Sequence, residues 1–188
     1  MTLKRGFRAN AERMALQIRQ DLGLRPIDPL DLRALASRRG VEIVAADSLV
    51  PRAELEELER LQAFAFSACT FDVDGTQVIV VSPLRSASRQ TSDIAHELSH
   101  ILLRHQLTEI REIAGITFRT CRTDQEEEAT SLGGTLLLPR PLLIRAVSRG
   151  MSIDQIAKTY GVTADMARFR VNTTGVIKQV SARASRLG

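Results

Sequence analysis

Apolar residues recur at spacings of three and four over most of the chain, which is the period of amphipathic helices. Residues 10–22 and 91–105 show this spacing most clearly. Because a helical turn takes about 3.6 residues, the apolar side chains of each stretch fall on one face. We therefore predict a helix over each stretch, with Thr91 or Ser92 as the N-cap of the second.

A different pattern in the first half of the chain predicts β-structure. Residues 41–45 alternate enough to form a strand, and the apolar runs 63–71 and 77–82 flank an Asp-Gly pair at positions 74 and 75. Asp-Gly between two apolar runs is a strong signal for a tight β-hairpin. These elements predict a small antiparallel sheet. The acidic stretch 53–62 is expected to form a short helix or an exposed excursion.

The chain becomes helical again beyond Pro139. We predict helices at residues 141–149, 153–160 and 164–171. The last two, joined by a short turn, resemble a helix-turn-helix, in which Arg168 and Arg170 could contact phosphates. We favour the alternative, a helical cap packed on the preceding domain. The predicted domains are residues 1–145 and, for the cap, 146–188.

One helix carries the main candidate chemistry. His96 and His100 are four residues apart, with Glu97 directly after the first, which makes a His-Glu-x-x-His pattern. On a helix both imidazoles lie on one face and can bind one metal ion, usually zinc. Glu97 is rotated by about 100°, where a general base for a metal-bound water belongs. The alternative is two unrelated surface histidines, but the chain has only 3 histidines. We interpret His105 as a packed or hydrogen-bonded structural residue.

A catalytic zinc also needs a third protein ligand. The next candidates are three adjacent glutamates, Glu126, Glu127 and Glu128, at the start of another predicted helix. Glu126 shares a helical face with small residues, so a second helix can approach it closely. We predict Glu126 as the ligand, followed in preference by Glu127 and Glu128. A solvated acidic first turn, favoured by the helix dipole, would account for the other two.

These residues together resemble the ImmA/IrrE family of zinc metallopeptidases. The resemblance rests on the His-Glu-x-x-His helix and on a later Glu-x-x-Ala helix that runs into Leu-Leu-Leu-Pro at residues 136–139, and it extends over residues 11–175. The sequence departs from the family where Ser99 replaces a glycine and Thr130 replaces a polar Asn, Asp or His. A histidine common at position 104 stands one place later.

The resemblance implies a fold, a site and a substrate. The fold would be a zincin-like α+β metallopeptidase with a helix-turn-helix-like C-terminal cap. Zn²⁺ would be held by His96, His100 and Glu126, with Glu97 as the catalytic residue. The substrate backbone would add to an exposed sheet edge, for which we predict residues 65–70.

Members of this family typically cleave a helix-turn-helix transcriptional repressor at one site and so derepress mobile-element or stress-response genes. This chain is accordingly expected to be a site-specific endopeptidase. Two alternatives from other classes remain open at this point. One is a non-catalytic partner that binds a repressor, as in toxin–antitoxin pairs, and the other is a DNA-binding regulator.

Composition and charge limit the class of protein, its location and its partners. The 188 residues, 44% hydrophobic and 26% charged, are ordinary for a globular protein, and no apolar run approaches the ~20 residues that span a membrane. We see no signal peptide, so we expect a cytoplasmic protein. Only Cys69 and Cys121 are present, which excludes a disulfide framework and a cysteine zinc site. The net charge of +4 favours a solvated basic surface over a nucleic-acid partner.

Overall fold

Helices dominate the chain, as the apolar spacing predicts, and the strands lie between residues 41 and 120. The computed structural model describes residues 3–63, 66–106, 109–113 and 116–185. In chain order the elements are α1 (Phe7–Asp21), α2 (Leu32–Arg38), β1 (Val41–Ala45), the 3₁₀ turn η1 (Ala46–Ser48), α3 (Arg52–Leu61), β2 (Ala68–Val73), β3 (Thr76–Val81), α4 (Ala87–Leu103), β4 (Glu109–Ile113), β5 (Ile116–Thr120), α5 (Thr123–Leu137), α6 (Arg140–Ser148), α7 (Ile153–Tyr160), α8 (Ala164–Thr174) and α9 (Val176–Ala184).

The hairpin predicted around Asp74 and Gly75 is confirmed. Strands β2 and β3 pair antiparallel across this turn, in which the two residues have positive φ angles of 51° and 83°. Positive φ at both central positions is the type I′ geometry that suits the twist of paired strands. Strand β1 pairs in parallel with the other side of β3, giving the order β1-β3-β2.

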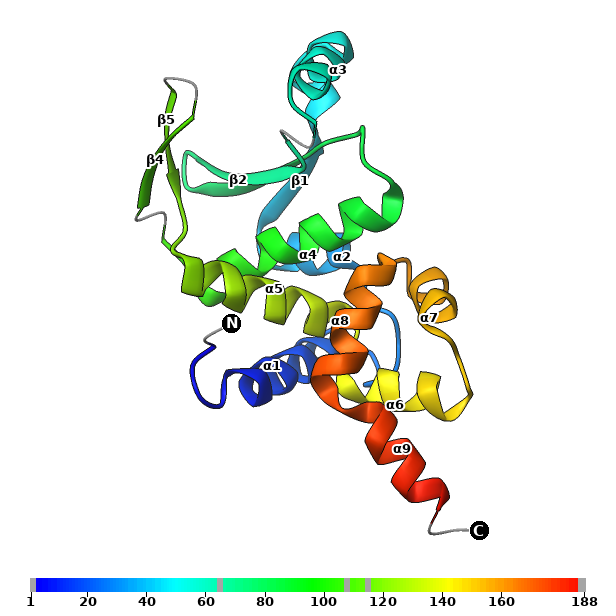
Figure 1. Ribbon diagram of the computed structural model, residues 1–188. Coiled ribbons are helices and arrows are strands. Elements are labelled where there is room, and N and C mark those ends of the chain that lie inside the picture. The colour runs from blue at the N-terminus through cyan, green and yellow to red at the C-terminus, as the bar shows by residue number, and fades with distance from the viewer. Residues whose placement is uncertain (1–2, 64–65, 107–108, 114–115, 186–188) are drawn as a thin grey trace.

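The α+β class is therefore confirmed, but the three-stranded sheet is mixed rather than antiparallel throughout. The reason is the connection between β1 and β3, which passes through α3 and β2 and is long enough to bring the chain back in the same direction. The predicted helix at 53–62 forms as α3, which stands beyond the sheet (Figure 1). Within α3, Leu55 alone is buried, so most of this helix faces solvent.

Two helices form the centre of the molecule. Helix α4 lies between the three-stranded sheet and α5, and α5 lies between α4 and α1 (Figure 1). A Cβ atom placed on Gly133 of α5 would lie only 3.0 Å from the carbonyl oxygen of Ala95 on α4. Leu98 and Leu132, with 0% exposure, belong to the same core. The small residues beside Glu126 thus do allow another helix to approach closely.

The helix that carries the His-Glu-x-x-His pattern begins earlier than predicted. Its first residue is Ala87, and the hydroxyl of Ser86 accepts a hydrogen bond from the backbone N–H of Arg89. The prediction of Thr91 or Ser92 as N-cap is wrong, because both hydroxyls donate to carbonyls one turn earlier inside the helix. Hydroxyl side chains can bond in either way, and their local sequence does not distinguish the two.

The C-terminal helices pack against the rest of the chain through α8. The Arg170 side chain on α8 is buried, donates to the carbonyl oxygen of Leu138 at 3.1 Å, and lies 2.6 Å from a carboxylate oxygen of Glu12 on α1. The prediction that Arg170 could contact phosphates is therefore wrong. Arg168, on the exposed side, pairs with Asp165. The predicted boundary at 145/146 falls inside α6, and the division into two domains stays a prediction.

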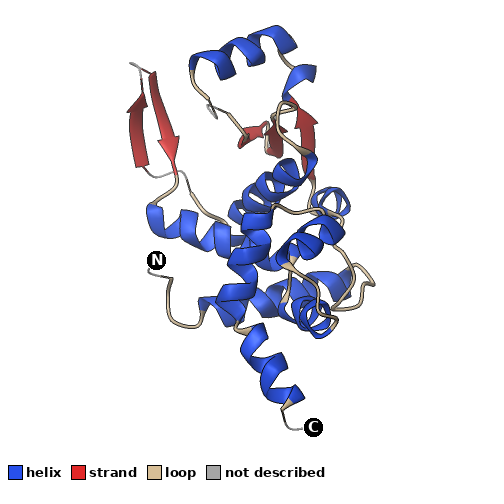
Figure 2. Cartoon of the chain, turned by 45° about the vertical axis from the view of Figure 1, so that its right-hand side comes forward, coloured by secondary structure: helices blue, strands red, loops and turns tan. Residues whose placement is uncertain are grey.

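The β4–β5 hairpin and helix α9 were not predicted. Strands β4 and β5 pair antiparallel in a sheet of their own, apart from the three-stranded one (Figure 2). Helix α9 runs from the end of α8 to the C-terminus, away from the body of the molecule. Among the residues that the structure describes, no helix is both long enough and apolar enough to cross a membrane.

Replacement of Arg170 by Met should destabilise the fold far more than the same replacement of Arg168. Loss of the buried guanidinium leaves the Oε1 atom of Glu12 and the Leu138 carbonyl without this partner, which we expect to cost about 3 kcal/mol, the lower end for a broken buried ion pair. Arg168→Met lies on the same helix but exposed, so its effect should stay within about 0.5 kcal/mol. Urea denaturation of both variants measures the difference, and equal losses would contradict a structural role for Arg170.

Candidate metal centre

The two histidines of the motif converge as their spacing predicts. The Nε2 atoms of His96 and His100 lie 3.0 Å apart on one face of α4, with the ring centroids 4.7 Å apart. Two nitrogens at this distance are attractive only if a proton or a cation lies between them, since two facing lone pairs repel. The facing nitrogens can therefore share either one proton, in an N–H···N hydrogen bond, or one metal ion.

Glu126 reaches the same point from α5. One of its carboxylate oxygens, Oε2, lies 3.1 Å from the Nε2 atom of His96 and 3.6 Å from that of His100. Hydrogen bonds with His100 and His96 hold the pKa of Glu126 below its ordinary value, so this carboxylate is ionised at neutral pH. Among the described residues, these three form the one group of His, Cys, Asp or Glu side chains close enough to hold a metal ion.

The donor set fits zinc. Four-coordinate zinc with bonds of about 2.0–2.2 Å places neighbouring ligand atoms roughly 3.4 Å apart, and the three measured separations of 3.0, 3.1 and 3.6 Å lie close to that value. Two imidazoles and one carboxylate form the ligand set of one well-known class of catalytic zinc sites, in which a fourth position stays open. The Glu126 side chain has a relative solvent exposure of 46%, so the cluster is accessible from solvent.

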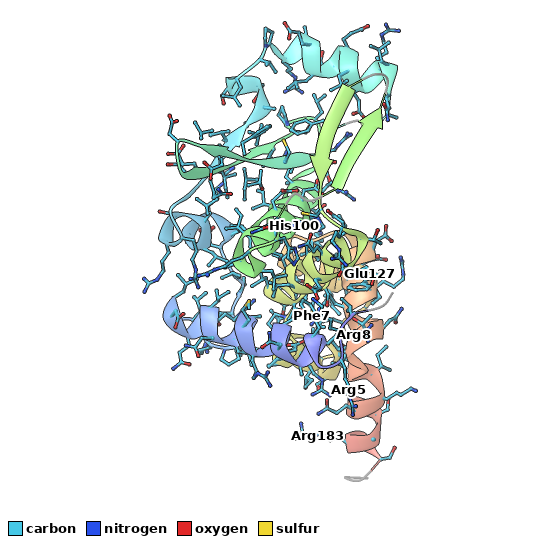
Figure 3. The ribbon with its side chains drawn as sticks, turned by 90° about the vertical axis from the view of Figure 1, so that its left-hand side faces the viewer. Arg5, Phe7, Arg8, His100, Glu127 and Arg183 are labelled. Carbon is cyan, nitrogen blue, oxygen red and sulfur yellow. The ribbon has the colours of Figure 1, made fainter. Side chains whose placement is uncertain are left out.

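The other two glutamates of the acidic run do not join the cluster. Glu128 is buried on the far side of His100, where its carboxylate lies 3.2 Å from the Nε2 atom of His105. Glu127 lies farther from the centre of the molecule than His100 does (Figure 3). The preference for Glu126 over its two neighbours therefore agrees with its position, and its role as a ligand stays a prediction.

Glu97 lies beside the cluster and is held by a residue that the sequence analysis missed. The hydroxyl of Thr70 donates a hydrogen bond of 2.7 Å to the Oε2 atom of Glu97. Thr70 belongs to β2, which among the described strands is paired on one side only. The contact joins residues 27 positions apart, and no local pattern points to it. It links the edge of the sheet directly to the proposed base.

Behind the cluster, the remaining ring nitrogens of both histidines also have partners. The Nδ1 atom of His100 lies 3.0 Å from Nδ1 of His105 and 3.3 Å from the sulfur of Cys121. The prediction of His105 as a hydrogen-bonded residue is confirmed. Thr130, the departure from the family pattern, lies 3.5 Å from Nδ1 of His96, at the outer limit of a hydrogen bond. Burial raises the pKa of the Cys121 thiol to about 11, so this side chain is neutral at pH 7.

Two hollows meet at the cluster. The larger, of about 900 Å³, extends along β2 and is lined by Thr70, Phe71 and all three proposed ligands. The smaller, of about 470 Å³, extends towards α8 and contains Met166 and Phe169. His96 and Glu97 line both of them.

The predicted substrate-binding edge at 65–70 overlaps with β2 over its last three positions, Ala68, Cys69 and Thr70. These positions lie on the free edge of the sheet and line the larger hollow. Ala65 lies outside the described residues. His96 and Glu97 line the same hollow as this edge.

Comparison with known proteins agrees with this geometry. The family model of Peptidase_M78, the IrrE N-terminal-like domain, matches residues 36–172. No curated protein sequence gave a significant match. Among solved structures, a Mycobacterium tuberculosis transcriptional regulator aligns with a TM-score of 0.55 and 19% identity, over 90% of this chain and 47% of the regulator. This chain thus spans about half the length of that protein, and the likeness establishes the fold alone.

The family match covers well over half of the chain and includes every residue of the cluster. It confirms the resemblance to the ImmA/IrrE family that the two helical motifs indicated. A match to a metallopeptidase family and the cluster of two histidines and a glutamate that lies within the matched residues both point to a metal centre. The chain belongs to the Peptidase_M78 family, the family of IrrE N-terminal-like domains.

Proposed function

We propose that this chain is a zinc-dependent endopeptidase that cleaves a helix-turn-helix transcriptional repressor at one site. The observation that carries the proposal is the convergence of His96, His100 and Glu126 at one point, beside Glu97 and beneath the free edge of β2. A metal site alone would serve many purposes. A metal site with an adjacent carboxylate and a peptide-binding edge is suited to hydrolysis of a peptide bond.

Each side chain has a separate task in this proposal. His96, His100 and Glu126 would hold the zinc ion, which supplies a Lewis acid that lowers the pKa of water and stabilises negative charge. The carboxylate of Glu97 takes the proton of the attacking water and later delivers it to the nitrogen of the leaving amine. Thr70 fixes the orientation of Glu97 through the 2.7 Å hydrogen bond to Oε2.

Selectivity for one repressor would follow from the shape of the site. Strand addition on β2 accepts only a segment that can become extended, which excludes most of a folded protein. Side chains on either side of the scissile bond would enter the two hollows, one of them lined by Met166 and Phe169. The repressor as substrate and the derepression of mobile-element or stress-response genes come from the family likeness, and they are part of the proposal together with the cytoplasmic location expected from the sequence.

The two other classes of function differ in what they require. A DNA-binding role for α8 loses one of its two proposed phosphate contacts, because Arg170 is buried against Glu12 and Leu138. A non-catalytic partner of a repressor would use the same cleft but would have no need of Glu97 beside the metal cluster. The experiments below therefore separate binding of the repressor from its cleavage.

Replacement of Glu126 by Gln should remove zinc, whereas the same replacement of Glu127 should not. The purified chain is expected to bind about one zinc ion, through ligands from α4 and α5. Loss of a ligand should weaken zinc binding by more than the roughly 10–100-fold typical of a residue that only supports a ligand. Competition with a coloured chelator measures both variants. Loss of zinc in Glu127→Gln with retention in Glu126→Gln would assign the third ligand to Glu127.

Glu97→Gln should retain zinc and the fold but lose proteolysis. The amide is close to the carboxylate in size but cannot accept the proton, so we expect the cleavage rate to fall by at least about 10²–10⁴-fold. The assay incubates each protein, with and without a chelator, with the helix-turn-helix repressor encoded next to its own gene, and mass spectrometry identifies the products. Cleavage by Glu97→Gln at the normal rate would disprove the assignment of the base. Binding without cleavage by the unsubstituted chain would favour the non-catalytic partner.

Thr70→Val should lower the turnover number while leaving KM and zinc content nearly unchanged. Valine has almost the same shape but cannot donate to Glu97, so the carboxylate loses its fixed orientation. A misplaced catalytic group costs up to about 10²-fold in rate, and we expect a loss of about 10–100-fold here. Thr70→Ser keeps the hydroxyl and serves as the matched control. An unchanged turnover number in Thr70→Val would contradict a positioning role for this hydrogen bond.

A further inference from the structure

A second group of polar side chains lies behind His100, on the side away from the proposed zinc position. The Nδ1 atom of His100 is 3.0 Å from Nδ1 of His105, and Nε2 of His105 is 3.2 Å from a carboxylate oxygen of Glu128. The relative solvent exposure of the His100, His105 and Glu128 side chains is only 12%, 5% and 10%. We call this group the Glu128–His105–His100 relay.

The end of α4 delivers His105 to this position. Arg104 has a φ angle of 55°, in the left-handed region, and turns the chain at the end of the helix. The backbone N–H of His105 then donates to the carbonyl oxygen of His100 at 2.9 Å. This turn brings the two rings together edge to face, with centroids 5.0 Å apart and planes inclined by 71°.

The hydrogen-bonding properties of the three groups determine where the protons lie. An ionised carboxylate accepts hydrogen bonds and cannot donate them, so Nε2 of His105 must carry a proton towards Glu128. In a neutral imidazole the other nitrogen is then an acceptor. The short contact between the two Nδ1 atoms consequently requires the proton on Nδ1 of His100. With the metal bound, His100 then has its lone pair on Nε2, the atom that lies beside His96 and Glu126 and would bind the ion.

The same placement of protons follows from the metal-binding role of His100. A histidine that binds a metal through Nε2 keeps its single proton on Nδ1 and donates it to an acceptor nearby. His105 can accept that proton only if its own proton is on Nε2, and there Glu128 receives it. Metal binding by His100 and hydrogen bonding to Glu128 therefore require the same two tautomers: His100 protonated on Nδ1 and His105 protonated on Nε2. With Glu128 ionised, no other placement of two protons satisfies both contacts.

We propose that Glu128 and His105 are positioning residues that fix the tautomer and orientation of His100 and so set the affinity for zinc. This inference rests on the zinc site of the proposed function. The buried charge of Glu128, transmitted through His105, makes the Nε2 lone pair of His100 a stronger donor to the metal. Among the described residues, the Nδ1 atom of His96 has the 3.5 Å contact with Thr130 and no other, so the relay distinguishes the two histidines.

Cys121 is the competing partner of His100. Its sulfur lies 3.3 Å from the same Nδ1 atom, and a thiol that donated to Nδ1 would force the proton of His100 onto Nε2. A thiol is a weak donor and a weak acceptor, whereas the contact between the two rings is shorter and leads to a carboxylate. Cys121 therefore lies beside the relay as a minor contact, and its replacement provides a control.

The test measures zinc affinity by chelator competition in His105→Leu, Glu128→Gln and the double variant, without any substrate. Each single replacement is expected to weaken zinc binding by about 10–100-fold. Because Glu128 acts through His105, the double variant should be no weaker than His105→Leu alone. Losses that multiply in the double variant would show independent structural effects and would overturn the relay.

Control variants and a spectroscopic measurement keep the test decisive if His105→Leu folds poorly. His105→Gln can accept from His100 and donate to Glu128 at once, so it should recover most of the affinity. Cys121→Ala and Glu127→Gln should bind zinc as the unsubstituted chain does. In the zinc-loaded, unsubstituted chain, ¹⁵N NMR of the imidazoles should find the protons on Nδ1 of His100 and Nε2 of His105. The opposite tautomers, or a loss of affinity confined to Cys121→Ala, would disprove the proposal.

These results are separate from those that test proteolysis. A chain that shows the predicted tautomers and affinities but cleaves no repressor would support the relay and contradict the proposed enzyme. A chain that cleaves its repressor while His105→Leu retains full zinc affinity would do the reverse.

Discussion

The close packing of α4 against α5 is the constraint on which the rest of the structure depends. Two of the three proposed metal ligands come from α4 and the third from α5, so the cluster exists only while these helices are in register. Gly133 makes this approach possible, because any side chain there would meet the backbone of Ala95 and His96 at 3.0–3.2 Å. The interface buries Leu98 and Leu132 without residual exposure, which supplies the apolar contribution that holds the two helices together.

Buried polar contacts then hold α5 along its length. Near its first turns, Glu128 bonds to His105 at the end of α4. At its C-terminal end, Arg19 donates to the carbonyl of Leu136 at 2.7 Å and Arg170 donates to that of Leu138. The last carbonyl groups of a helix have no backbone N–H within the helix to accept from. Buried guanidinium groups from α1 and α8 donate to these carbonyls instead. Burial lowers the pKa of Arg19 to about 10, which still leaves it protonated at neutral pH.

The sheet contributes to the site through its edge rather than its face. Strand β2 carries Thr70, which bonds to Glu97, and the same edge borders the larger hollow. A peptide that pairs with β2 would therefore lie against the strand that orients the proposed base. The proposed peptide-binding edge and the proposed base are in this way joined by one hydrogen bond, as accurate placement of a scissile bond would require.

The features that the sequence alone determined are local ones. The His-Glu-x-x-His pattern predicts two imidazoles on one helical face because positions i and i+4 are always one turn apart, and the Asp74–Gly75 turn predicts its hairpin for a similarly local reason. Glu126 could be preferred over its two neighbours because the small residues on its face predict a helix–helix contact.

Other features were decided by the tertiary structure alone. The bond from Thr70 to Glu97 spans 27 positions and that from His105 to Glu128 spans 23, and both depend on how separate elements pack. From the sequence, Arg170 is predicted to be a surface residue. In the structure it is buried, because α1 and the end of α5 surround it. A helical or alternating pattern tells which residues share a face. It does not tell which other face they meet, because that depends on the packing energy of the whole chain.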